Sequence, residues 1–235
     1  SHASEATIVR TCKKLGYQGY YHLKIALAKE VINPDNSYPE NTDFSDITSL
    51  ATFLLKKQAE DLIQSTQFFN ADVLESILKL LANCDTIFFF AAGNSNPLAV
   101  YSAYKFSQLG LKTVVHVSPE MQINAAYSMG KRDLAIGISN SGSTNLMVDI
   151  FKVVKERGAK SVCITNYIKS PLSKLSTHQL NTAVSDKIFF EAFDSTRVPA
   201  MGVIDMLVLL FMYKNKAHYE KYRTREEFLG SRFKG

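Results

Sequence analysis

Cysteine is scarce in the 235-residue chain, and its apolar runs are short. Cys12, Cys84 and Cys163 are widely spaced and form no CxxC pair, so neither a disulfide framework nor a zinc site is indicated. The longest nearly uninterrupted apolar run, residues 206–213, is well short of the roughly 18 residues of a membrane span. The first residues lack the basic and apolar regions of a signal peptide. We therefore expect a protein of the reducing cytoplasm, with no membrane partner.

Motifs for metals and nucleotide cofactors are also missing. The five histidines are scattered, without HxxxH or a paired His and carboxylate spacing. The chain has no P-loop lysine and no GxGxxG. We expect neither a metal site nor a cofactor.

Positive charge gathers at the two ends of the chain, whose formal net charge is +5. Residues 1–30 hold five basic and two acidic side chains, and residues 214–235 hold seven basic and three acidic ones. The intervening residues hold 15 basic and 17 acidic side chains. A polyanion would therefore be attracted to the ends.

Five short apolar, β-branched or aromatic runs lie between residues 86 and 184, each separated by a stretch long enough for a helix. They are TIFFFAA (86–92), TVVHV (113–117), DLAIGI (133–138), SVCIT (161–165) and LNTAV (180–184). This alternation is typical of a parallel sheet covered on both faces. We predict an α/β fold with a doubly wound, parallel five-stranded sheet over about residues 83–213.

The segments that precede and follow this sheet have different compositions. Residues 33–46 hold two Pro, three Asn and three Asp residues, which indicates a linker. Residues 47–69 predict an amphipathic helix of the kind that packs on a partner subunit. Its stripe is Leu50, Leu54, Gln58, Leu62, Thr66 and Phe69. We expect the next helix to begin with Asp72 as its N-cap and the tail, residues 214–235, to be only partly ordered.

Polar loops follow the first and third predicted strands, at the end of the sheet where a doubly wound fold binds its ligands. Gly93, Asn94 and Ser95 lie in the first loop, and residues 139–144, SNSGST, form the second. Each loop leads into a helix, whose first N–H groups and dipole favour an anion. Gly142 would let the backbone come close to such a ligand. A plain turn with an N-cap is the alternative interpretation of either loop.

SNSGST resembles the S-x-S-G-x-T signature of sugar isomerase (SIS) domains, and AAGNSN is similar to their earlier glycine-and-serine loop. The resemblance extends over about residues 70–213. It implies a flavodoxin-like domain whose loops hold the phosphate of a phosphosugar through Ser and Thr hydroxyls and backbone N–H groups. The implied phosphate-binding residues are Asn94, Ser95, Ser139, Asn140, Ser141, Gly142, Ser143 and Thr144. Asn96 and Pro97 depart from the small residues that the family more often has.

SEATIVRTCKKLG, residues 4–16, predicts a short basic helix that begins at Ser4. The stretch is similar to the S-x-x-T-x-x-R start of the recognition helix of RpiR-type bacterial transcriptional regulators, and LGYQGYYHLKIAL resembles their next helix. That family joins a helix-turn-helix to a SIS domain through a linker. The implied DNA-contacting residues are Ser4, Thr7, Arg10, Lys13, Lys14, Tyr20 and Lys24. Because the family's earlier helices have no counterpart before Ser1, we expect an all-α helix-turn-helix remnant that binds DNA weakly or not at all.

Catalysis is the alternative to sensing at the phosphosugar site. Isomerisation needs a positioned base beside the sugar, and His116, Glu120 and Glu191 are the candidates. Each is better explained as a packed, capping or solvated side chain, so we expect a protein that is not an enzyme. A phosphosugar isomerase and a phosphosugar-binding module without DNA activity stay open as alternatives.

These patterns divide the chain into three predicted parts. Residues 1–32 form the partial helix-turn-helix, residues 33–46 the linker, and residues 47–235 the SIS domain with an N-terminal dimerisation helix. The expected protein is a DNA-binding transcriptional regulator of sugar metabolism. It would respond to a phosphorylated sugar and act as a homodimer or a dimer of dimers.

Overall fold

The computed structural model describes residues 5–15, 46–183 and 197–233 of the chain. Backbone contacts divide the chain into two compact units, Ser1–Ala51 and Thr52–Gly235. The described part of the first unit contains helix α1 (Glu5–Lys14) and the start of helix α3 (Ile47–Ser65). The predicted cap Ser4, the predicted second helix and most of the predicted linker lie outside the described residues.

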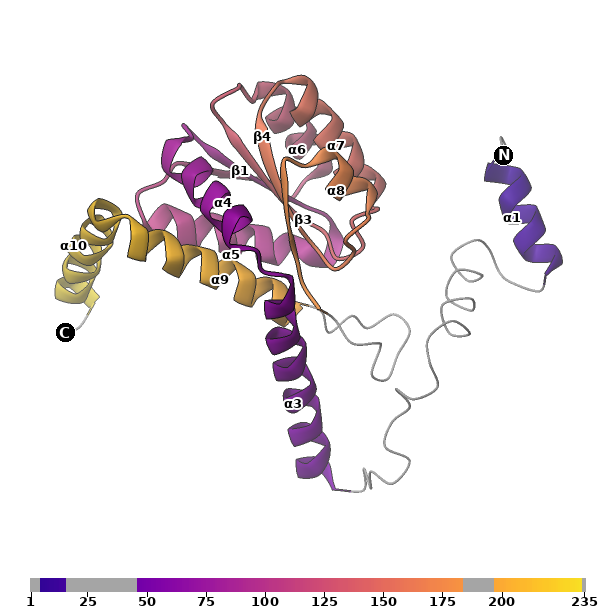
Figure 1. Cartoon of the computed structure of the whole chain (residues 1–235), viewed down its shortest axis with the longest axis horizontal. Coiled ribbons are helices and arrows are strands. Elements are labelled where there is room, and N and C mark those ends of the chain that lie inside the picture. Colours follow the sequence, from indigo (N-terminus) through magenta and orange to yellow (C-terminus); the bar gives the residue numbers. More distant parts are fainter. Residues whose placement is uncertain (1–4, 16–45, 184–196, 234–235) are drawn as a thin grey trace. The chain divides into compact units, whose positions relative to one another are not determined.

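The second unit is built on a parallel sheet of five strands in the order β2-β1-β3-β4-β5. Figure 1 labels β1, β3 and β4 of this sheet among the helices that cover it. The strands are β1 (Ile87–Ala91), β2 (Thr113–Val115), β3 (Leu134–Ile138), β4 (Lys160–Thr165) and β5 (His178–Asn181). This arrangement confirms the predicted doubly wound α/β fold. The fifth strand begins two residues earlier than the run LNTAV predicts, at His178.

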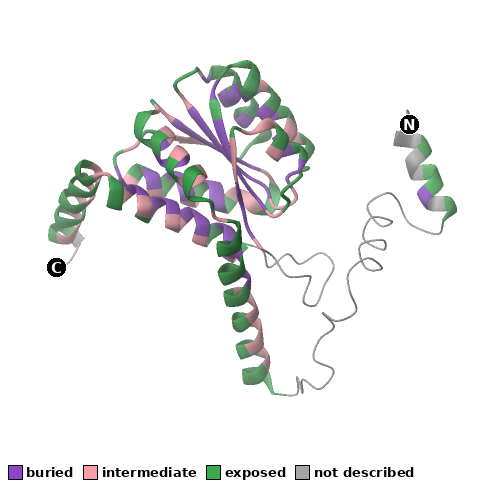
Figure 2. Ribbon diagram, in the orientation of Figure 1, coloured by how far each residue is buried: buried purple, intermediate pink, exposed green. Residues whose placement is uncertain are grey.

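Helices cover both faces of the sheet. On one face lie α4 (Ala71–Asn83), α5 (Asn96–Gln108) and α9 (Arg197–Lys214), and on the other lie α6 (Pro119–Ser128), α7 (Asn145–Glu156) and α8 (Pro171–Leu175). Phe89 packs on the first face and its neighbours Phe88 and Phe90 on the second, because successive side chains of a strand point to opposite faces. Figure 2 shows the buried residues gathered in the sheet and along the inner sides of these helices.

Two of the predicted helix details are wrong. Helix α4 begins two residues earlier than expected, because the side chain of Asn70, rather than that of Asp72, accepts a hydrogen bond from the Val73 N–H (3.1 Å). The tail forms helix α10 (Lys216–Phe233) instead of a partly ordered segment. Its exposed charges pair at helical spacing, as Arg223 does with Glu220 (2.9 Å) and Glu227 (3.8 Å).

A ring contact and a hydrogen bond fix the start of α10 on the domain. The His218 ring lies 5.0 Å from the Phe211 ring, measured between centroids. Its Nδ1 is 2.7 Å from the carbonyl oxygen of Leu109 at the end of α5. Among the described residues no single helix is long and apolar enough to cross a bilayer, although α9 and α10 pass that test as a pair bent by 108°.

Asp46 directly precedes helix α3, and its carboxylate accepts hydrogen bonds from the Ser49 hydroxyl (2.8 Å) and the Ser49 N–H (2.9 Å) in the first turn. These bonds lower the pKa of Asp46 below its usual value. Leu50, Leu54 and Gln58 of the predicted stripe are half-buried, whereas Leu62 and Thr66 are exposed. A different set of apolar side chains stays exposed on this helix, with Leu55 at 68% and Ile63 at 67%.

Candidate functional site

The two polar loops leave the sheet side by side. Ala91, the last residue of β1, pairs with Ile138, the last residue of β3, so both loops start at the same edge of the sheet. The first loop contains a short 3-10 turn, η3 (Gly93–Ser95), and continues directly into α5. The second loop, residues 139–144, leads into α7. The structure therefore brings together all eight residues that the resemblance implies.

The last residue of β4 and the segment that follows this strand form hydrogen bonds with the backbone of loop 139–144. The carbonyl oxygen of Asn140 accepts hydrogen bonds from the Thr165 hydroxyl and the Asn166 N–H, both at 3.0 Å. The Leu172 N–H donates to the carbonyl oxygen of Gly142 (2.9 Å). These bonds fix the backbone of the loop before any ligand arrives.

Gly142 is buried and has a φ of +59°, a conformation that residues with a Cβ rarely adopt. A Cβ at this position would lie 2.5 Å from the Cβ of Ser170 and 2.9 Å from the hydroxyl oxygen of Thr165. The close approach of these two side chains therefore requires glycine. Gly93 in the first loop has a similar φ of 54°, but a Cβ there would meet no atom within 4 Å.

Two hydroxyl groups at the helix starts are not used for capping. Ser95 is the N-cap residue of α5 and Thr144 is that of α7, yet neither side chain accepts the usual hydrogen bond from its own helix. Ser141 differs, because its Oγ accepts from the hydroxyl (3.1 Å) and the N–H (3.3 Å) of Ser143. The N-termini of α5 and α7 thus lie at the C-terminal end of the strands, with hydroxyl groups beside them. This arrangement suits an anion.

Arg197, at the start of α9, reaches the first loop from a distant part of the sequence. Its Nε donates to the carbonyl oxygen of Asn94 (3.0 Å), across 103 residues of chain. Beside this contact the side-chain Oδ1 of Asn96 is buried without a hydrogen bond. No local pattern predicts the role of Arg197, since it depends on a contact between segments that meet only in the folded domain.

The candidate catalytic residues lie at a different strand. His116 is half-buried just after β2, and Glu120 is exposed in the first turn of α6. Since β2 and β3 flank β1 on opposite sides, these residues follow a strand that is not next to β3. Glu191 lies outside the described residues. In the described ranges no three His, Cys, Asp or Glu side chains gather as a metal site requires.

The predicted DNA-contacting residues are described only in part. Thr7, Arg10 and Lys14 are exposed on α1, a helix that the basic stretch 4–16 predicts. Lys13 belongs to the same helix. Ser4, Tyr20 and Lys24 lie outside the described residues.

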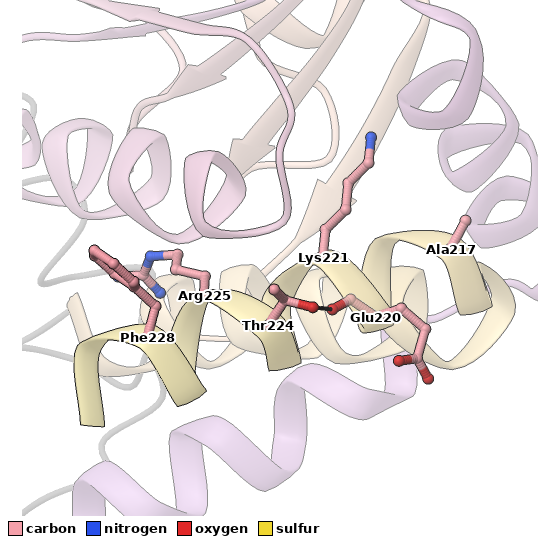
Figure 3. A pocket seen from close by; sticks show the side chains of 6 residues that line it. All are labelled: Ala217, Glu220, Lys221, Thr224, Arg225 and Phe228. Carbon is pink, nitrogen blue, oxygen red and sulfur yellow. Dashed lines mark hydrogen bonds between the residues drawn. The ribbon is translucent and has the colours of Figure 1, made fainter. Parts of the chain in front are cut away.

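An open groove lies on α10, which follows the C-terminal end of α9; Figure 3 shows the side chains that line it. Its lining residues are Ala217, Glu220, Lys221, Thr224, Arg225 and Phe228. The Thr224 hydroxyl donates to the Glu220 carbonyl oxygen (3.0 Å), so it is satisfied within the helix. The groove lies beside the C-terminal end of α5, where a Cβ at Gly110 would be 3.2 Å from the Lys221 side chain, whereas the first polar loop precedes the other end of that helix.

Two known protein families match the chain, in the same order along the sequence as the motifs. More than half of the chain, residues 80–210, matches the family model of the SIS domain. Residues 1–34 match that of the helix-turn-helix domain, rpiR family. An uncharacterized HTH-type transcriptional regulator from Caldanaerobacter subterraneus subsp. tengcongensis is 30% identical over 224 residues, which cover 93% of this chain and 78% of that protein.

Solved structures share the fold. NanR of Vibrio vulnificus, complexed with ManNAc-6P, superposes with a TM-score of 0.76 at 24% identity, over 97% of this chain and 81% of that one. The sugar isomerase domain of an RpiR transcription factor from Sphaerobacter thermophilus gives a TM-score of 0.67 at 18% identity, over 76% of this chain and 98% of that one.

Proposed function

Because the chain belongs to the RpiR-type family of transcriptional regulators with a SIS domain, we propose that Asn94, Ser95 and residues 139–144 hold the phosphate of a sugar phosphate effector. In this proposal residues 1–32 reach DNA, and residues 47–235 form the effector-binding domain. The observation that carries it is the pair of N-cap hydroxyls, Ser95 and Thr144, that cap nothing in their own helices.

The residues divide between side-chain and backbone roles. Ser95, Ser139, Ser141 and Thr144 offer hydroxyl groups to the phosphate oxygens. Asn94, Asn140, Gly142 and Ser143 contribute mainly backbone, and the bonds from Thr165 and Leu172 keep that backbone in place. A preformed loop loses little conformational entropy when the ligand binds, which favours affinity. The neighbour that was solved with ManNAc-6P makes an N-acetylhexosamine phosphate a suitable first ligand to test.

A thermal-shift panel tests the proposal. We expect sugar phosphates to stabilise the full chain and their dephosphorylated counterparts not to do so, because the site recognises the phosphate. A ligand at a hundred times its dissociation constant should add about 2.7 kcal/mol to the free energy of unfolding. Thr144→Val is the matched variant. It should bind roughly 10- to 100-fold more weakly, since one charge-assisted hydrogen bond is lost, while its stability without ligand stays unchanged.

Equal stabilisation by the free sugars would contradict the phosphate cradle. Each sugar phosphate that binds should then be tested for aldose–ketose interconversion. We propose that the site senses its ligand without converting it, which the regulator relatives support. Turnover that requires His116 or Glu120 would favour the isomerase instead.

DNA recognition by α1 is a separate proposal, supported by its match to the helix-turn-helix family and by exposed Arg10. In full-length protein, Arg10→Ala should reduce discrimination between operator and unrelated DNA about 10- to 100-fold, because it removes a base contact. Lys13→Ala should weaken binding to all DNA about equally and lower the salt slope by about 1. Fluorescence anisotropy over a salt series distinguishes the two effects. Unchanged discrimination by the Arg10 variant would contradict the assignment.

We propose that a second copy of the chain covers the exposed apolar side of α3. At 100° per residue, Leu55 and Ala59 lie within one narrow arc of this helix, and both are exposed. Ile63 extends the arc and is 67% exposed. A helix face of this kind is normally buried against a partner. A homodimer would also present two DNA-binding helices, as paired half-sites require.

A further inference from the structure

Both polar loops are connected to the last turn of α3, residues 62–65, by separate series of contacts. One series starts at the first loop and runs through α9. The other starts at loop 139–144 and runs along the ends of β4 and β5. All the residues involved belong to the second compact unit and are described.

The first series begins at the hydrogen bond from the Arg197 side chain to the carbonyl oxygen of Asn94. Helix α9 carries the connection five residues further to Gly202, about 7.5 Å along its axis. There the absence of a side chain lets Leu62 of α3 approach so closely that a Cβ at Gly202 would overlap its δ-methyl group. A shift of the first loop that moves Arg197 therefore displaces the surface on which Leu62 rests.

A second contact makes this series stiff. The hydroxyl of Tyr101, on α5, donates to the Asp205 carboxylate on α9 (2.6 Å). This bond to Asp205 is the main cause that raises the pKa of Tyr101 to about 12. The first loop is thus joined to α9 by Arg197, and the helix that continues from this loop is joined to α9 by Tyr101.

The second series begins inside loop 139–144, where the Thr165 hydroxyl donates to the carbonyl oxygen of Asn140 (3.0 Å). The Thr165 carbonyl oxygen accepts from the Thr182 N–H (3.1 Å). The next residue, Ala183, donates its N–H to the hydroxyl oxygen of Ser65 (2.9 Å), across 118 residues of chain. Thr165, Thr182 and Ser65 are all buried, so these bonds are partly shielded from water.

We propose that effector binding changes the position of the last turn of α3. Arg197 and Ser65 are the positioning residues that link this turn to the two loops. The proposal rests on the phosphosugar site proposed above and adds the route by which that site controls the rest of the chain. Helix α3 is suited to this role because it leads from the effector domain toward the DNA-binding residues in the sequence. A change at one end of a rigid helix is transmitted along its length.

Hydrogen exchange of the full chain, with and without N-acetylmannosamine 6-phosphate, tests the route. In the unsubstituted protein the ligand should slow exchange in residues 93–96 and 139–145 and, by about fivefold or more, in the last two turns of α3. In the double variant Arg197→Ala, Ser65→Ala, the ligand at saturation should still slow hydrogen exchange in loop 139–144. In this variant the ligand should slow exchange in the last two turns of α3 by less than about twofold. Arg197→Lys should retain part of the response of α3, because an ammonium group can donate to the Asn94 carbonyl oxygen.

The matched control is the double variant Arg157→Ala, Ser107→Ala. Like Arg197, Arg157 donates from Nε to a backbone carbonyl, that of Met129 (3.1 Å). The Ser65 hydroxyl donates to the Asp61 carbonyl oxygen of its own helix (2.8 Å), and the Ser107 hydroxyl donates in the same way to that of Tyr104 (2.7 Å). Neither Arg157 nor Ser107 belongs to the two series, so this variant should respond as the unsubstituted protein does. An α3 response that survives loss of Arg197 and Ser65 while the loops still respond would overturn the route alone. If neither loop responds to the ligand in the unsubstituted protein, both the route and the phosphosugar site are refuted.

Discussion

Gly142→Ala is expected to abolish the response to sugar phosphates and to destabilise the domain by about 3 kcal/mol, the sum of left-handed backbone strain and overpacking. The new methyl group would overlap the Ser170 side chain and crowd the Thr165 hydroxyl. Relief of this overlap requires loop 139–144 to move away from the segment after β4. The carbonyl oxygens of Asn140 and Gly142 would then lose the bonds that hold them. Denaturant unfolding and the thermal-shift panel measure the two effects.

Gly93→Ala is the control for this substitution. Gly93 has nearly the same backbone conformation, but a Cβ there meets no other atom within 4 Å. Gly93→Ala should therefore lower the free energy of unfolding only by the strain of a left-handed residue, about 1–2 kcal/mol. It should leave loop 139–144 intact. If Gly142→Ala binds sugar phosphates as tightly as the unsubstituted chain, this loop is not the phosphate cradle.

Leu55→Glu is expected to convert the proposed dimer into a monomer, with a dissociation constant raised about 100-fold or more. Leu55 is 68% exposed in the single chain, and burying a leucine contributes about 1.5–3 kcal/mol. A twofold symmetric interface buries it twice, and a glutamate there would have to be desolvated on both copies. Sedimentation velocity over a concentration series gives the dissociation constant.

Gln64→Glu introduces the same charge nine residues further along α3, on the opposite side of the helix. Gln64 is exposed, so this variant should dimerise normally. Equal sedimentation of Leu55→Glu and the unsubstituted chain would exclude this side of α3 from the interface. In that case the apolar arc would need another explanation.

The sheet and both polar loops follow from the sequence because their signals are local. Each buried strand is a short apolar run, and each loop lies directly after its strand, so the order of motifs places the loops at one edge. The positions of Gly93 and Gly142 are equally readable, since a glycine beside polar residues indicates a turn. The family resemblance then attaches a ligand class to these residues.

The contacts that hold the site together have no such local signal. Arg197 meets Asn94 across 103 residues, and Ser65 meets Ala183 across 118 residues. Neither pair has a spacing or composition that distinguishes it from an ordinary surface arginine or helical serine. The sequence does not predict that residues 216–233 form an ordered helix, for a related reason. The start of α10 is held by the contact of His218 with the end of α5, which is distant in the sequence. Which apolar side of α3 is buried also depends on the packing of α9, notably at Gly202.

The described sheet ends on one side in β2, a strand of only three residues. An edge this short presents few unpaired backbone N–H and C=O groups to another chain, and natural proteins use such edges to resist strand addition. Fibrillar growth from this edge is therefore disfavoured even when the concentration of the regulator is high. Self-association that starts from the described edge at β2 therefore has little backbone template.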